Sequence, residues 1–454
     1  MTSLDLTVEP FAPRLRRHLR ELVRLALPVM VARAGQMTMV TADTIVVGRY
    51  GAEDLAHLGL AGAIQGTLLA IMAGLLLGTV VKTAQAMGAG QAQEAGAVWR
   101  RSIPYALLIG LLAGLFCLAG EPFFRLTGQS EPLAVGGGRV MTIYGFGMAG
   151  AALLFTSTFF LEGIKRPLPG MVAILLANLA NLGLNWGLVF GRFGLPELGA
   201  EGSALATTLV RWAMALGLMA YVWRLRDHER FGIRRPAGGW AAGGEQRRLG
   251  YAAGLSSGLE ASAFSALALF AGWLGALGVG AFTVGLNLIA LPFMAALGLA
   301  SATAVRVGTA HGAGNRADTV LAGWSGLGLT SLLLSGVALL FWFLPDGIAR
   351  LFASDPALVA VAVPVVAFSA LILVADGGQV VMAQALRGRN DAWMPTALHF
   401  ISYYAIMMPL GWVLAFPLQR GVMGLFEGIF IASIVSVSIL SVRFWWLSRG
   451  EAGR

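Results

Sequence analysis

Twelve long apolar segments fill almost the whole chain, and they limit its fold more than any other feature. An α-helix needs roughly 20 mostly apolar residues to cross a lipid bilayer. The segments lie at residues 22–47, 56–81, 102–121, 135–163, 168–191, 201–223, 249–276, 279–304, 320–344, 357–386, 395–417 and 421–447. The sequence therefore predicts an all-α polytopic membrane protein with twelve transmembrane helices and no separate soluble domain.

The composition excludes several other classes of protein. Hydrophobic residues make up 57% of the 454 residues and charged residues only 12%. Soluble domains carry about 25% charged residues, so a soluble chain of this composition could not cover its own surface. This excludes an ordinary cytosolic enzyme, a disordered protein and a nucleic-acid binder, despite the net charge of +9. The single cysteine, Cys117, excludes a disulfide framework and a cysteine-based zinc site.

The basic residues predict the orientation in the membrane. Of the 32 Lys and Arg residues, 24 fall on one predicted side, 6 on the other, and Arg33 and Arg211 inside spans. Cytoplasmic loops collect Lys and Arg, so we expect both termini and the 224–248 loop in the cytoplasm. The first span lacks the short core and cleavage site of a secretory signal, so we expect it to be retained.

The two halves of the chain repeat each other. Lys82-Thr-Ala-Gln-Ala-Met-Gly-Ala-Gly90 matches Arg306-Val-Gly-Thr-Ala-His-Gly-Ala-Gly314 at an offset of 224 residues. Six helices per half give both copies the same orientation, related by an axis along the membrane normal. Such repeats are typical of transporters with a site between the halves, although channels have repeats too. The predicted parts are a tail at 1–21, an N-lobe at 22–223, a linker at 224–248, a C-lobe at 249–447 and a tail at 448–454.

Among the acidic residues in the predicted spans, four lie away from the terminal residues of the spans: Asp43, Glu260, Asp376 and Glu427. A charged residue in the bilayer costs several kcal/mol unless it is paired, protonated or hydrated, so each is a functional candidate. Under the repeat, Glu260 aligns with Gln36, while Asp43 and Asp376 align with apolar residues. Acids that only hold a symmetric scaffold together should recur in both halves, so this asymmetry favours a function. The alternative is that each acid bonds neighbouring helices together. Glu427 lies near the outer end of its span, which favours a structural role there.

Polar residues of two further spans suit a cation near Asp43. Asn178, Asn181 and Asn185 lie at helical spacings of three and four, so they share one face. With Thr207 they would supply neutral oxygens, which a small hard cation prefers. Interhelical amide hydrogen bonds explain the spacing equally well. Arg33 and Arg211 are interpreted either as counter-charges or as side chains that reach the membrane surface.

These features together resemble the multidrug and toxic compound extrusion (MATE) family. Ala26-Leu-Pro28, Asp43-Thr44 and Leu184-Asn-Trp186 resemble its N-lobe, as do the paired Gly-Ala-Gly segments. Glu260, Asp376-Gly-Gly-Gln-Val-Val381 and Leu386-Arg-Gly388 resemble the NorM-like branch. The resemblance covers residues 22 to 447. It implies two six-helix lobes forming a V-shaped central cleft, which export lipophilic organic cations in exchange for Na⁺ or H⁺.

The resemblance also implies residue roles. Asp43, Asn181, Asn185 and Thr207 match the N-lobe cation or proton site. Glu260 and Asp376 match the C-lobe cation-binding acids, with Asn287 as a nearby polar position and Gln36, Gln379 and Glu427 as further candidates. Na⁺ is expected at Glu260, Asp376 or Asp43. Gly377-Gly378 departs from the bulkier residues expected there, which suggests a locally loosened span. The family also implies a monomer among the lipids of a bacterial inner membrane, with no cofactor beyond the coupling ion.

Buried carboxylates by themselves suggest a transport mechanism. A carboxylate in an apolar cleft attracts a lipophilic cation, and a proton or Na⁺ competes for the same group. The main alternative is a flippase for a lipid-linked oligosaccharide or related lipid, which should need a cationic cavity for pyrophosphate. A membrane-embedded enzyme is disfavoured because no His-Glu-x-x-His motif or compact nucleophile–base pair is present. A channel is disfavoured by the lack of a filter-like segment.

Overall fold

The computed structural model describes residues 11–352 and 355–450. The outer parts of the two predicted tails, residues 1–10 and 451–454, lie outside the described residues. Within the described residues, twelve helical segments are long and apolar enough to cross a membrane, which confirms the predicted all-α fold. The N-terminal half contains α1 (Phe11–Tyr50), α2 (Ala52–Leu76), α3 (Gly78–Gly88), α4 (Ala92–Leu118), α5 (Gly120–Leu126), α6 (Glu131–Gly163), α7 (Leu168–Phe190) and α8 (Gly199–Trp223).

The C-terminal half repeats this order. It contains η1 (Trp240–Gly243), α9 (Gly244–Trp273), α10 (Gly275–Gly312), α11 (Arg316–Phe343), α12 (Pro345–Phe352), α13 (Pro356–Gly388), α14 (Trp393–Phe400), η2 (Ile401–Met407), α15 (Met408–Ala415) and α16 (Gly421–Gly450). Helices α2 and α3 form the second span, and α14, η2 and α15 form the eleventh. Element η2 is a π-helix, a form that is often found at functional sites.

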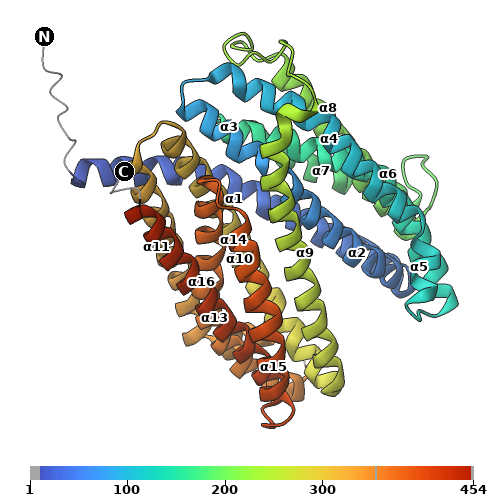
Figure 1. Ribbon diagram of the computed structural model, residues 1–454. Coiled ribbons are helices and arrows are strands. Elements are labelled where there is room, and N and C mark those ends of the chain that lie inside the picture. The colour runs from blue at the N-terminus through green and yellow to red at the C-terminus, as the bar shows by residue number, and fades with distance from the viewer. Residues whose placement is uncertain (1–10, 353–354, 451–454) are drawn as a thin grey trace, which may run out of the picture.

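The two halves form two lobes that diverge as a V (Figure 1). Helices α1–α8 make the N-lobe and α9–α16 the C-lobe. The lobes meet at the end where α1 begins and α16 finishes. The first turns of α1 lie against the C-lobe. Towards the other end, Gly59, Gly62 and Gly66 of α2 have no neighbouring atom within 4 Å of an added Cβ. These open positions, with the divergence of the lobes, agree with the V-shaped cleft expected from the resemblance.

Repeat-related glycines make a very close contact between the lobes. A Cβ on Gly88 would lie 1.9 Å from the carbonyl oxygen of Thr309, and one on Gly312 would lie 2.1 Å from that of Gln85. Both pairs are related by the offset of 224 residues. Small residues let helices approach closely in membranes, and only glycine fits here. The Gly-Ala-Gly repeat is therefore explained by the packing of α3 against α10 about the pseudo-twofold axis.

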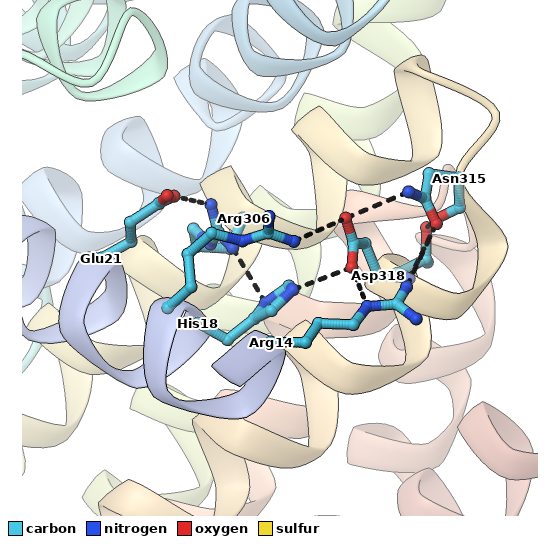
Figure 2. A network of polar contacts seen from close by, with 8 residues as sticks. Arg14, His18, Glu21, Arg306, Asn315 and Asp318 are labelled. Atoms are coloured by element: carbon cyan, nitrogen blue, oxygen red, sulfur yellow. Dashed lines mark hydrogen bonds and ion pairs between the residues drawn. The ribbon is translucent and has the colours of Figure 1, made fainter. Parts of the chain in front are cut away.

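Polar side chains also join the lobes at this end (Figure 2). Arg14 Nε donates to Asp318 Oδ1 at 2.7 Å, and His18 Nε2 lies 3.0 Å from the same oxygen. Arg306 pairs with Glu21 and lies 2.8 Å from His18 Nδ1. We name these five residues the inter-lobe cluster. Arg306 lies beyond the predicted span 279–304, but it lies inside α10, which continues to Gly312.

Candidate functional site

The predicted N-lobe residues assemble around Asp43, which α1 buries in the lobe. Asn185 Nδ2 donates to Asp43 Oδ1 at 2.7 Å, and Thr207 Oγ1 donates to Asp43 Oδ2 at 2.7 Å. Asn181 Nδ2 donates to Thr207 Oγ1 at 3.1 Å. Three helices, α1, α7 and α8, therefore bring one carboxylate together with two amides and a hydroxyl.

The three asparagines of α7 divide between the two interpretations that their spacing left open. Asn178 Nδ2 donates to the backbone oxygens of Gly35 and Ile174 at 3.0 and 2.8 Å, so it bonds α7 to α1 and does not reach Asp43. Asn185 Nδ2 instead reaches both Asp43 and Asn181 Oδ1, the latter at 3.0 Å. Asn185 Oδ1 is buried and has no hydrogen-bond partner among the described residues. The Asp43 cluster thus retains an unused oxygen acceptor.

A buried arginine lies beside the Asp43 cluster. Arg211 interacts electrostatically with Asp43, and its guanidinium lies 5.9 Å from the centre of the Tyr144 ring. Its Nη2 donates to Gln65 Oε1 at 3.4 Å. Because this side chain is buried in α8, the counter-charge interpretation holds for Arg211, and it does not reach the membrane surface.

The C-lobe acid Asp376 has a similar amide neighbour. Gln379 Nε2 donates to Asp376 Oδ1 at 2.5 Å and to the Tyr403 hydroxyl at 3.2 Å. All three side chains are buried, and Tyr403 comes from the π-helical element η2. Gln379 Oε1 is buried and has no partner in the described chain. This acid, like Asp43, therefore lies next to an amide whose carbonyl oxygen is unused.

The second C-lobe acid, Glu260, lies half-buried on α9 and interacts electrostatically with Asp376. One helical turn earlier on the same face, Ser256 Oγ lies 2.6 Å from His399 Nδ1. The centres of the His399 and Tyr403 rings lie 5.5 Å apart. The polar residues of α9, α13, α14 and η2 thus line one interior region of the C-lobe.

Several predicted residues do not join either cluster. Asn287 is exposed and Gln36 is half-buried, and neither makes a hydrogen bond to an acid in the described part of the chain. Glu427 pairs with Arg420, which agrees with a structural role near the end of the span. The expected loosening at Gly377-Gly378 is wrong, because α13 runs unbroken through both residues. A Cβ on Gly377 would lie 2.1 Å from Leu334 Cδ1, so this glycine serves close helix packing.

The sequence does not single out the buried charges of Glu162 and Arg387. Glu162 lies at the end of a predicted span, and Ser301 of the other lobe donates a hydrogen bond to it. Arg387 lies outside the predicted spans, yet it is only 6% exposed within α13. The repeat held the signal, because Leu161-Glu-Gly163 aligns with Leu386-Arg-Gly388 and places both charges at one equivalent position.

Comparison with known proteins decides the family. A model of the MatE family matches residues 28–186 and 252–413. The chain belongs to the MatE family. It is 40% identical over 426 residues to a Caulobacter vibrioides protein named "Probable multidrug resistance protein NorM", across 93% of this chain and 90% of that relative. It is 32% identical to "Multidrug resistance protein PmpM" of Pseudomonas aeruginosa over 95% of this chain and 92% of the relative. The chain is therefore a NorM-like MATE protein.

A solved structure shows the same fold. It is described as the outward-facing conformation of a multidrug resistance MATE family transporter, and the TM-score is 0.88. The match covers 97% of this chain and 98% of that chain at 21% identity. Identity at this level shows the fold alone, so the roles of the Asp43 and Asp376 clusters rest on the geometry described above.

Proposed function

We propose that this MATE protein exports lipophilic organic cations in exchange for Na⁺ or H⁺. The observation that carries the proposal occurs once in each lobe. Asn185 at Asp43, and Gln379 at Asp376, each donate to the carboxylate and keep a buried carbonyl oxygen without a partner. An unpaired buried acceptor is unfavourable, and a cation bound at the carboxylate would satisfy it. The names of the relatives support the drug-export part of the proposal.

The donor set is compatible with either coupling ion. Na⁺ is a hard cation that binds carboxylate, amide and hydroxyl oxygens, and Asp43, Asn185 and Thr207 offer all three. A proton needs only a carboxylate in an apolar setting, which both clusters provide. In each case the ion neutralises the charge that would hold an organic cation, so the ion and the drug compete.

Exchange also requires two arrangements of the lobes that both ligands bias. The glycine contacts and the inter-lobe cluster join the lobes at the end rich in basic residues, which we assign to the cytoplasm. In this arrangement the cleft opens away from the cytoplasm, where an incoming ion would displace the drug. The other arrangement requires these contacts to break. We infer that the protein works as a monomer, with both termini cytoplasmic, in the bacterial inner membrane.

The experiment is efflux of a fluorescent organic cation from proteoliposomes, with a Na⁺ gradient and a pH gradient imposed separately. Efflux driven by one gradient and not the other identifies the coupling ion and supports the antiporter. Folded protein that exports nothing under either gradient would contradict the proposal. A lipid-flipping assay on the same vesicles would then test the alternative of a lipid-linked oligosaccharide.

A further inference from the structure

Arg387 lies on the same stripe of α13 as the Asp376 cluster. Positions 376, 379, 383 and 387 follow helical spacings of three and four, so their side chains share one face. Eleven residues complete just over three full turns, which separates Asp376 and Arg387 by about 16 Å along the helix axis. This face of α13 therefore carries the Asp376 carboxylate and, further along the helix, the Arg387 guanidinium. Both face the interior of the C-lobe.

The guanidinium of Arg387 is buried without hydrogen bonds at two of its nitrogens. Its side chain is 6% exposed, and Nε and Nη2 have no partner among the described residues. A buried charge in this state is strongly unfavourable unless an opposite charge lies near. The titratable groups that interact electrostatically with it are Glu260 from α9, His399 from α14 and Tyr403 from η2. Glu260 is the carboxylate among these groups, so in its ionised form it supplies a charge opposite to that of Arg387.

We propose that Arg387 is the resident counter-cation of Glu260 and competes with transported cations for that carboxylate. The inference rests on the proposed function, since it assigns how the C-lobe site sets its affinity. Arg387 acts through Glu260 and is thus a positioning residue. When no transported cation is bound, the guanidinium balances the carboxylate. A cation that binds Glu260 meets the repulsion of Arg387, so the arginine weakens binding and favours release.

The N-lobe also pairs an acid with a buried arginine, at a position that the repeat does not relate to Arg387. Arg211 is 9% exposed, interacts electrostatically with Asp43, and has an Nη1 without a partner in the described chain. The repeat offset of 224 places Arg211 opposite Val435 and not opposite Arg387. Each lobe therefore combines an acid with a nearby buried arginine whose guanidinium is incompletely hydrogen-bonded. The two arginines come from different spans, so the duplication alone does not explain them.

The test measures binding of tetraphenylphosphonium to the full-length protein in nanodiscs at about pH 9, where protons compete least. Arg387→Gln removes the charge and keeps hydrogen-bond donors, and it should bind the cation about tenfold more tightly. Arg387→Lys keeps the charge and should stay within about twofold of the unmodified protein. Arg389→Gln is the matched control; that side chain bonds to Ser448 and Leu447 of α16, so its loss should leave binding unchanged.

A double-mutant cycle shows whether the effect passes through Glu260. In the Glu260→Gln background, Arg387→Gln should no longer change the affinity. An unchanged or weaker affinity for Arg387→Gln, in protein that still depends on Glu260, would overturn the inference. Binding that does not depend on Glu260 at all would instead refute its role in the proposed function.

Thermal unfolding keeps the inference testable if a single variant folds poorly. Removing one member of a buried charge pair leaves the other unbalanced, whereas removing both does not. The variant with both Glu260→Gln and Arg387→Gln should therefore melt at a higher temperature than Arg387→Gln alone. Melting temperatures that fall additively would contradict the pairing, whatever the binding assay shows.

Discussion

Asn185 Nδ2 donates to Asp43 Oδ1 at 2.7 Å, although the two residues lie 142 positions apart in the chain. This bond crosses from α7 to α1 and holds the carboxylate in place. Loss of a hydrogen bond to a charged group costs about 1.5–3 kcal/mol, so we expect Asn185→Leu to lower transport by roughly tenfold or more. Efflux from proteoliposomes measures this. Asn178→Ala is the control on the same helix, since Asn178 bonds only to backbone oxygens. An equal loss in both variants would refute a special role for Asn185.

The inter-lobe cluster predicts a shift in lobe position when Asp318 is changed. Asp318→Asn weakens the pairing with Arg14 and His18 (Figure 2), so the closed end should open more often. Spin labels at Ala89→Cys and Ala313→Cys, which are repeat-related and exposed, report the distance across this end. The background is Cys117→Ala, which removes the chain's single cysteine. We expect a longer-distance population in the Asp318→Asn protein, and an unchanged distance distribution would speak against the cluster as a closing contact.

The contact between Gly88 and Thr309 predicts an unusual response to alanine. Alanine in place of glycine inside a helix usually stabilises by up to about 1 kcal/mol. At Gly88 the added methyl would meet the carbonyl oxygen of Thr309, so Gly88→Ala should lower the melting temperature. Gly59→Ala on α2 has open space around it and should leave the melting temperature unchanged or raise it. The same response at both positions would mean that the lobes do not need this close approach.

The predicted linker is held to the N-lobe by an ion pair with a defined pH dependence. Arg166 donates to both oxygens of Asp227 at 3.0 and 2.6 Å, and this bonding lowers the pKa of Asp227 below its usual 3.8. Its contribution to stability is therefore present above pH 3.8 and is lost as the pH falls through the lowered pKa. Asp227→Asn should destabilise by at most about 1 kcal/mol at neutral pH. Melting curves of the two proteins should converge as the pH falls below the lowered pKa of Asp227.

The fold could be predicted from the sequence because the bilayer fixes the length and polarity of each span. The repeat offset likewise predicted two lobes, and it explains the paired contacts of Gly88 and Gly312. Helix ends were less predictable, since α1 and α10 extend beyond their apolar segments to carry the inter-lobe cluster. Hydropathy assigned Arg387 to a loop because a charge at the end of an apolar run looks like a span boundary. Only the packing of other helices, chiefly α10, α11 and α16, around α13 shows that it is buried.

The Asp43 cluster, in contrast, could be predicted in large part from the sequence. Helical spacing placed Asn181 and Asn185 on one face, and the cost of a buried carboxylate indicated that polar groups must surround Asp43. Spacing could not separate Asn178 from the other two, because which amide reaches the acid depends on how α7 packs against α1. Asn287 was expected near the C-lobe acids but is exposed, and its exposure likewise depends on how α10 packs.

Transport by variants of the three acids tests the proposed mechanism most directly. Efflux of a fluorescent organic cation should be lost in Asp43→Asn, Glu260→Gln and Asp376→Asn, while all three proteins still fold. Glu427→Gln is the matched control, because that acid is paired with Arg420 and lies outside both clusters. We predict that its efflux equals that of the unmodified protein. Full efflux in the three acid variants, driven by the same ion gradient, would contradict the assignment of these carboxylates to cation exchange.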